Sequence, residues 1–149
     1  MADTCPITGL RTILVATDGS AHSEKALHEA ISLSKACATK LHVMTVIEVN
    51  EEYEALAPQV VEKADEEAKM FLDAAQKCAE RENVSCSIIV HRGEDPAHFI
   101  VEEAEKLKAD MIVMGKHGKS KMLRKLFVGS VTAKVISHAH CKVLVVPSS

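Results

Sequence analysis

The residues best suited to bind a ligand lie in the C-terminal part of the chain, where glycines are spaced among basic side chains. Residues 111–149 contain no aspartate or glutamate, yet they hold seven of the 18 lysine and arginine residues of a chain whose net charge is -3. Gly115 and Gly118 follow an apolar run, and Gly129 and Ser130 come after ten further residues. Glycine lets backbone N–H groups approach a ligand closely, and a helix that begins near Ser130 favours negative charge. The segment is therefore predicted to bind phosphate.

A second candidate segment, Thr17-Asp18-Gly19-Ser20, follows the first apolar run of the chain. Taken alone, these residues are ordinary for a turn and a helix N-cap. In an open parallel sheet, however, ligands bind beyond the carboxyl ends of the strands, at the point where the strand order reverses. If the order is 3-2-1-4-5, this segment lies opposite the glycine-rich one, and a ligand site becomes the favoured interpretation.

The elements that must position these segments follow from the hydrophobic pattern. Five short apolar runs rich in β-branched residues alternate with four stretches of helical spacing, around Leu27, Ala68, Ile100 and Val135. The runs are predicted to be strands: Thr12–Ala16, Leu41–Val46, Cys86–Val90, Met111–Met114 and Lys142–Val146. They lack clean alternation, which favours burial on both faces. The pattern predicts a single doubly wound α/β domain over residues 1–149, with a five-stranded parallel sheet (order 3-2-1-4-5) and helices on both faces.

Two connections carry local signals. The stretch from Glu48 to about Pro58 is acidic, contains Tyr53, and is predicted to be an irregular link between the second strand and the second helix. Asp95-Pro96 is predicted to open the third helix, with Asp95 as the cap and Pro96 at the first helical position.

Composition argues against several classes of protein. No window approaches the roughly 18 consecutive apolar residues of a membrane span, and the N-terminus lacks a signal-peptide pattern, so a cytoplasmic protein with no membrane partner is expected. Overall acidity and the scarcity of aromatic residues argue against binding of nucleic acid. The five cysteines are odd in number and form no CxxC pair, so reduced thiols are expected rather than a disulfide framework or a zinc site.

Catalytic signatures are weak. The sequence has neither the GxxxxGK[ST] motif of P-loop enzymes nor a GxGxxG after the first strand. His117 lies inside the glycine turn, but no carboxylate nearby in the sequence would orient it, which favours an exposed histidine without a catalytic role. His138, His140 and Cys141 look like metal ligands, yet they fall where a predicted helix ends, and cations are expected there for electrostatic reasons. We therefore assign no catalytic residue and no metal ligand.

The chain resembles the universal stress protein family over nearly its whole length after Leu10. The resemblance rests on Ile13–Ser20, Asp110–Gly118, Val128–Val131 and the closing Cys141–Pro147. The family's nucleotide signature is G-x2-G-x9-G followed by Ser or Thr, and this sequence has G-x2-G-x10-G-S, with one additional residue.

The resemblance implies a stress-response regulator that binds ATP, with Mg²⁺, at the switch point of the sheet. It implies that Ala16, Thr17 and Asp18 approach ribose and adenine, and that Val46 offers backbone groups to the adenine edge. The residues implied to line ribose and phosphates are Met114, Gly115, Gly118, Gly129, Ser130 and Val131. Lys119 and Ser120 are further candidates for phosphate contact.

The resemblance also implies a homodimer. The predicted contact is the apolar fifth strand, Val143–Val146, because an unpaired edge strand can pair with its own copy about a two-fold axis. Two alternatives stay open at this point. Besides an ATP-binding regulator, the chain could be a slow ATPase, or a dimeric interaction module of the same fold that binds no nucleotide.

Overall fold

The computed structural model describes residues 5–117 and 128–148. Along the chain the elements are β1 (Thr12–Ala16), α1 (Ala21–Cys37), β2 (Lys40–Glu48), α2 (Glu51–Leu56), α3 (Pro58–Arg81), β3 (Cys86–Gly93), α4 (Pro96–Leu107), β4 (Met111–Gly115), α5 (Ser130–His138) and β5 (Lys142–Val146). The five predicted strands are all present, and β1 and β5 have the predicted bounds. Within the described ranges, no helix combines the length and the apolar character needed to span a membrane.

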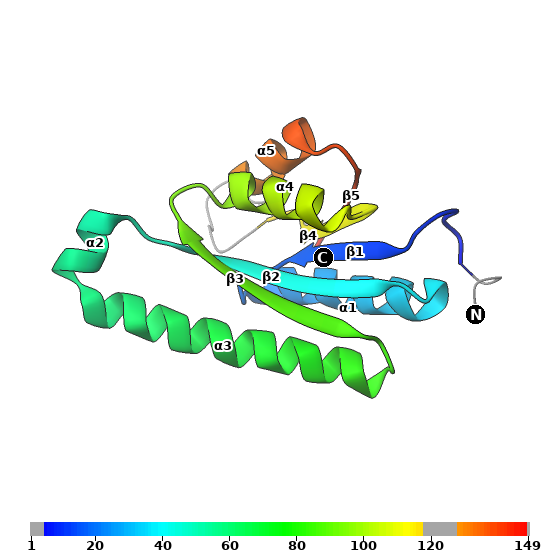
Figure 1. Cartoon of the computed structure of the whole chain (residues 1–149), viewed down its shortest axis with the longest axis horizontal. Helices are drawn as coiled ribbons and strands as arrows, with labels where there is room; N and C mark the ends of the chain where they lie inside the picture. Colours follow the sequence, from blue (N-terminus) through cyan, green and yellow to red (C-terminus); the bar gives the residue numbers. More distant parts are fainter. Residues whose placement is uncertain (1–4, 118–127, 149) are drawn as a thin grey trace.

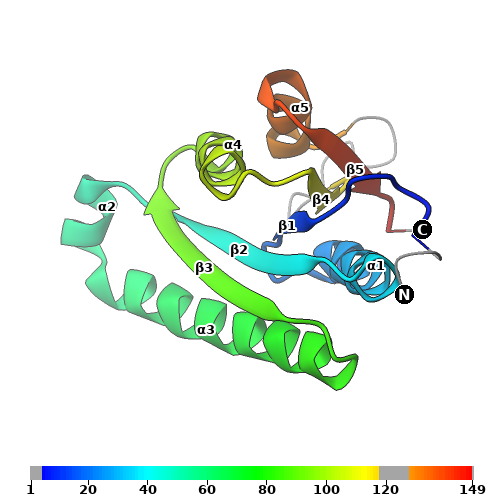
Figure 2. The ribbon, with the colours of Figure 1, turned by 45° about the vertical axis from the view of Figure 1, so that its right-hand side comes forward.

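All neighbouring strands pair in parallel, in the order β3-β2-β1-β4-β5. Helices α1 and α3 cover one face of the sheet, and α4 and α5 cover the other (Figure 1, Figure 2). The predicted doubly wound architecture is therefore confirmed. One carboxylate oxygen of Asp110 accepts the backbone N–H groups of Arg11 and Thr12, both at 2.9 Å, and so aligns the start of β4 with the start of β1. The loops that leave β1 and β4 thus begin side by side.

The central strand β1 contributes its two faces to two separate cores. Ile13 and Val15 pack among residues of α1 and α3, whereas Leu14 and Ala16 pack among residues of α4 and α5. Ile13, Leu14 and Val15 have no exposed surface. Burial on both faces, which the missing alternation predicted, is confirmed for this strand.

Strand β3 departs from that expectation, because it lies at the edge of the sheet and pairs with β2 alone. Ile88 and Val90 are 40% and 43% exposed, since α3 covers this end of the sheet only in part. At the carboxyl end of the strand, Arg92 forms an ion pair with Asp65 of α3. The prediction of burial on both faces was wrong for this strand.

The connection after β2 also differs from the prediction. The strand continues to Glu48, and the stretch expected to be irregular contains α2. The side-chain oxygen of Asn50 accepts the backbone N–H of Tyr53 at 2.6 Å, which caps the first turn of this helix. The helix has no apolar stripe and buries no residue, so periodicity alone could not reveal it.

Helix α4 begins at Pro96, as predicted, with Asp95 in the N-cap position. No side-chain hydrogen bond is made at that cap, so the expected capping interaction of Asp95 is absent. The fixed φ angle of the proline is the remaining start signal.

A disulfide joins Cys5 to Cys37, which are 32 residues apart in the chain. The expectation of reduced thiols was therefore wrong for this pair. The segment before β1 brings Cys5 to the end of α1, a position that cysteine spacing does not encode. The other three cysteines are free and half-buried. Burial, with a smaller contribution from Glu80, raises the pKa of Cys86 to about 11, which keeps this thiol protonated.

Candidate functional site: a cavity at the carboxyl end of the sheet

A cavity of about 840 Å³ lies beyond the carboxyl ends of β1, β2 and β4. Most of the residues proposed from the sequence line it: Ala16, Thr17, Asp18, Val46, Met114, Gly115, Gly129, Ser130 and Val131. The other three, Gly118, Lys119 and Ser120, lie outside the described residues. Segments more than 100 residues apart in the chain thus share one cavity at the switch point of the sheet.

The loop after β1 is both a capped turn and a wall of the cavity. A carboxylate oxygen of Asp18 accepts the backbone N–H of Ser20 at 2.9 Å, and the Ser20 hydroxyl accepts the N–H of Ser23 at 3.3 Å. The hydroxyl groups of Thr17 and Ser23 are 2.7 Å apart. The turn-and-cap interpretation of this segment is confirmed, and it does not compete with a ligand site, because Asp18 and Thr17 line the cavity from the same turn.

At the opposite wall, the turn after β4 is tied to the first turn of α5. The N–H of Gly129 donates to the carbonyl of Lys116 at 2.9 Å, and the Thr132 hydroxyl donates to the carbonyl of Gly115 at 2.8 Å. Gly129 is the N-cap of α5 and no side chain caps it. The first N–H groups of a helix have no partner within the helix, and they carry the positive end of its dipole. Ser130 and Val131 line the cavity at this point, so its α5 wall favours an anionic group.

The far end of the cavity, beside β2, α2 and α3, is formed mainly by residues without a ligand-binding signal of their own in the sequence. β2 runs past the end of β1, whose last residue is in register with Met44, and its continuation brings Val49, Asn50 and Tyr53 to the cavity. Further apolar wall comes from α3 and α4: Val60, Val61, Ala64, Ala68, Phe71 and Ile100. The signal that could have identified this end is the position of Asn50 just after a predicted strand, because the switch-point rule applies to every strand that borders the site.

The charged side chains among the described lining residues are carboxylates: Asp18, Glu48, Glu67 and Glu94. An anionic ligand is therefore expected to place its charge at the N-terminus of α5 and not at the end of β2. Carboxylate and hydroxyl oxygens are the ligands that Mg²⁺ takes in proteins, and Asp18, Thr17 and Ser130 supply such oxygens around the cavity. The donor set fits a magnesium ion bound together with phosphate.

The three histidines near the predicted turn and helix end lie in different places. His117 lines the cavity. His138 bonds through Nδ1 to the carbonyl of Lys134 at 2.8 Å, and His140 lies 3.2 Å from Glu105 of α4. Among the residues that the structure describes, no group of three or more His, Cys, Asp or Glu side chains could hold a metal ion.

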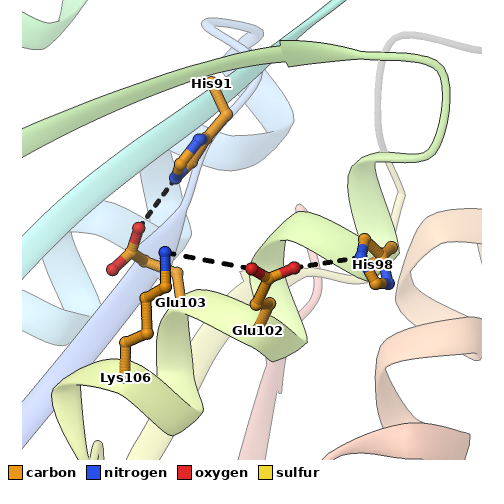
Figure 3. Close-up of polar contacts among 5 residues, drawn as sticks. All are labelled: His91, His98, Glu102, Glu103 and Lys106. Atoms are coloured by element: carbon orange, nitrogen blue, oxygen red, sulfur yellow. Dashed lines mark hydrogen bonds and ion pairs between the residues drawn. The ribbon is translucent and has the colours of Figure 1, made fainter.

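A separate polar cluster joins β3 to α4 (Figure 3). Nε2 of His91 lies 2.7 Å from a carboxylate oxygen of Glu103, and Glu102 contacts His98 at 3.0 Å and Lys106 at 3.8 Å. His91 is in register with Val46 of β2. The cluster does not line the cavity, but it braces the edge of the sheet beside the strand that does.

Comparison with known proteins finds a family and several solved structures that are similar to this chain. Residues 9–147 match the universal stress protein family. Universal stress protein MJ0531 of Methanocaldococcus jannaschii is 37% identical over 140 residues, which cover 91% of this chain and 81% of that protein. The solved structure of hypothetical protein MJ0577, used for a structure-based assignment of its biochemical function, matches this chain with a TM-score of 0.81 and 31% sequence identity. The match covers 93% of this chain and 96% of the MJ0577 chain. A universal stress protein in complex with cAMP has a TM-score of 0.63 and 29% identity, with coverage of 94% and 98%.

Proposed function

The chain belongs to the universal stress protein family, and on that premise we propose that its cavity binds an adenine nucleotide, ATP with Mg²⁺, as part of a regulatory role in the stress response. The observation that carries the proposal is the α5 N-terminus, which faces a cavity of about 840 Å³ at the switch point of the sheet. A related universal stress protein has been solved in complex with cAMP, which is itself an adenine nucleotide.

On this proposal, the turn after β4 and the start of α5 hold the phosphates. The backbone N–H groups of Ser130 and Val131 are directed to the phosphate oxygens, as at other helix N-termini that bind anions. Gly118, Lys119 and Ser120 are proposed as further phosphate contacts. Asp18 is proposed to contact the ribose and the metal ion.

The nucleoside then extends toward β2. Ala16, Thr17, Met114 and Gly115 form the floor under it, and Val46 offers backbone groups to the edge of the adenine. The apolar residues of α3 and α4 that line this end suit a planar base, since ligand pockets combine apolar walls with a few placed polar groups.

The protein is proposed to hold the nucleotide and not to turn it over at enzymatic rates. Hydrolysis of a phosphoanhydride needs a group that positions the attacking water, besides neutralisation of charge on the phosphates. The contacts proposed here stabilise the bound ground state, and ground-state binding alone does not accelerate a reaction. Mg²⁺, when bound, would offset the charge of the phosphates beside Asp18.

The direct test is calorimetry with Mg²⁺-ATP, ADP and AMP on protein that has been unfolded, dialysed and refolded to remove ligand. Gly129→Val should abolish binding. Gly129 has a φ of −59°, which any residue can adopt, so the valine tests how closely the ligand approaches and not backbone strain. Ser130→Ala should weaken binding by about 0.5–3 kcal/mol, the contribution of one hydrogen bond. Hydrogen bonds to charged groups, such as a phosphate, lie at the upper end of this range.

Ser137→Ala is the matched control, because Ser137 lies on the same helix, does not line the cavity, and donates its hydroxyl to the carbonyl of Ala133 one turn earlier. It should bind as the unchanged protein does. If no adenine nucleotide binds to the refolded protein, the proposal fails, and the interaction module without nucleotide takes its place.

We also propose that the chain forms a homodimer through β5. Val143, Leu144, Val145 and Val146 are only half-buried, and β5 is the edge of the sheet at this side. Ile136 of α5 is 49% exposed and extends the apolar surface. Val145→Lys should give monomers by light scattering, and a monomeric unchanged protein at high concentration would contradict the proposal.

The proposed location is the cytoplasm. Disulfides are rare in that compartment, so the bond between Cys5 and Cys37 would be an exception there. Cell fractionation should recover the protein with the cytoplasmic fraction, and recovery outside it would contradict the location.

A further inference from the structure

Helix α2 holds its shape through local hydrogen bonds and not through burial. The side-chain oxygen of Asn50 accepts the N–H of Tyr53 at 2.6 Å, and the carbonyl of Tyr53 accepts the N–H of Ala57 at 2.9 Å. The helix buries none of its residues and lies next to the N-terminal end of α3, beyond the carboxyl end of β2 (Figure 1). The backbone of Tyr53 is therefore fixed at both ends, while its side chain stays accessible.

Apolar side chains are exposed where α2 meets the start of α3. Some of them line the cavity, and one does not. Tyr53 and Val60 are each 47% exposed, and both line the cavity. Leu56, on the same short helix, is 77% exposed and does not line the cavity. The first two side chains present apolar surface to the space where a ligand would lie, and the third presents it to solvent.

The sheet sets the direction in which a nucleotide would lie. Its anionic end belongs at the N-terminus of α5, beside β4, and β2 is separated from β4 by β1. Neighbouring strands are about 4.8 Å apart, so the end of β2 is about 10 Å from the end of β4 across the sheet. A nucleotide with its phosphates at α5 must extend over β1, and its base then comes to the end of β2 and to α2.

We propose that Tyr53 covers the base of the bound nucleotide by stacking its ring on it, with Val60 beside it. The inference rests on the proposed function and goes beyond it, because it assigns base recognition to a helix outside the glycine-rich segment. An aromatic ring stacks on any base, so Tyr53 contributes affinity for a nucleoside over a bare phosphate, and selection among bases is left to the edge contacts at Val46.

The chain is well suited to a direct test, because it contains one tyrosine and no tryptophan. Protein labelled with 3-fluorotyrosine gives one ¹⁹F resonance, which reports on position 53 alone. Addition of Mg²⁺-ATP to ligand-free protein should shift this resonance with the same saturation curve that calorimetry gives. Inorganic tripolyphosphate, which has the charge without the base, should leave the resonance in place even where it competes with ATP.

Three variants complete the test. Tyr53→Ala should weaken ATP binding about tenfold, in line with the loss of one base–aromatic stack. Tyr53→Phe should bind as the unchanged protein does, because the ring is kept. Leu56→Ala is the matched control on the same helix and should also leave binding unchanged, and thermal unfolding of all three checks that the fold is intact.

The outcomes separate this inference from the proposed function. If ATP binds but the ¹⁹F resonance does not move and Tyr53→Ala binds normally, the stacking role is overturned while nucleotide binding stands. If Tyr53→Ala and Leu56→Ala weaken binding equally, α2 acts through its structure and not through the ring, which also overturns the inference. If no nucleotide binds at all, both fail.

Discussion

Gly19 lies directly against the ring of Phe71: a Cβ added at Gly19 would come within 2.5 Å of the ring carbon Cδ2. Gly19 has a φ of +78° and stands in the loop that carries Asp18, while Phe71 comes from the middle of α3 and lines the cavity. Helix α3 is therefore packed onto the Asp18 loop at a point where any side chain at position 19 would displace the Phe71 ring. Two contacts therefore hold the Asp18 loop: Phe71 packs against Gly19, and the Ser20 hydroxyl caps the helix that follows.

Gly19→Ala should lower both stability and nucleotide affinity. An alanine at positive φ costs about 1–2 kcal/mol, and the contact with Phe71 adds to this, because the ring must move within the wall of the cavity. Gly9→Ala is the matched control. Gly9 has a φ of +77° but nothing within 4 Å of an added Cβ, so it carries the backbone cost without the contact. Thermal unfolding and calorimetry of the two variants check this, and equal losses in both would show that the Phe71 contact is unimportant.

Removal of the disulfide should lower stability without preventing folding. The bond closes a loop between residues 32 positions apart, and such a crosslink contributes about 2–4 kcal/mol, largely by restricting the unfolded chain. The double variant Cys5→Ser, Cys37→Ser should therefore unfold at lower urea concentration than the oxidised protein. A reducing agent should shift the unchanged protein to the same midpoint and leave the double variant where it is. A reducing agent that shifts neither protein would show that the bond contributes nothing.

His42 should make stability depend on pH. Burial beside β3 and α4 lowers the pKa of His42 from its ordinary value of 6.5, with Glu103 opposing the shift and Lys40 adding to it; Ser87 holds Nδ1 at 2.5 Å. Below pH 6.5 the unfolded chain takes up a proton at His42 more readily than the folded protein does, so stability falls as the pH is lowered through this range.

The measurement is the free energy of unfolding of the unchanged protein and of His42→Gln between about pH 5 and pH 8, the range in which histidine titrates. The unchanged protein should lose stability relative to the variant toward the acid end, because the contributions of the other histidines are common to both. Parallel curves would exclude His42 as the source.

Turnover of ATP should lie far below the roughly 1–1000 per second of ordinary enzymes. His117 lines the cavity near the proposed phosphate position, so it is the residue to test. His117→Ala should change the rate of phosphate release little, if release is measurable at all. Fast release that His117→Ala abolishes would make His117 a catalytic group and the protein an ATPase.

Much of the fold was predictable because the central strands are buried on both faces and the four longer helices carry apolar stripes. The two loops at the switch point could be found for a related reason: Asp18-Gly19-Ser20 and Gly129-Ser130 combine turn chemistry with the start of a helix. In both cases the local sequence and the tertiary position favour the same structure.

The end of the cavity beside α2 was not predictable in the same way. Asn50 caps α2 and Tyr53 lies within it, and this helix is too short to show periodicity. The pairing of Cys5 with Cys37 depends on the path of the segment before β1, which no local pattern specifies. The partial exposure of Ile88 and Val90 follows from their place at the sheet edge, a property of the whole topology and not of the strand sequence.

The bond between Cys5 and Cys37 turns the first part of the chain into a covalent ring that contains all of β1, the Asp18 loop and all of α1. β1 is the middle strand of the sheet, with β2 on one side and β4 on the other, so the ring encloses the central strand. A protease that cuts the Asp18 loop at the exposed Gly19 therefore cannot release a fragment while the bond is intact, because the disulfide still joins both sides of the cut. Such nicked protein should run as one species in a denaturing gel without reductant and as two when reductant is added.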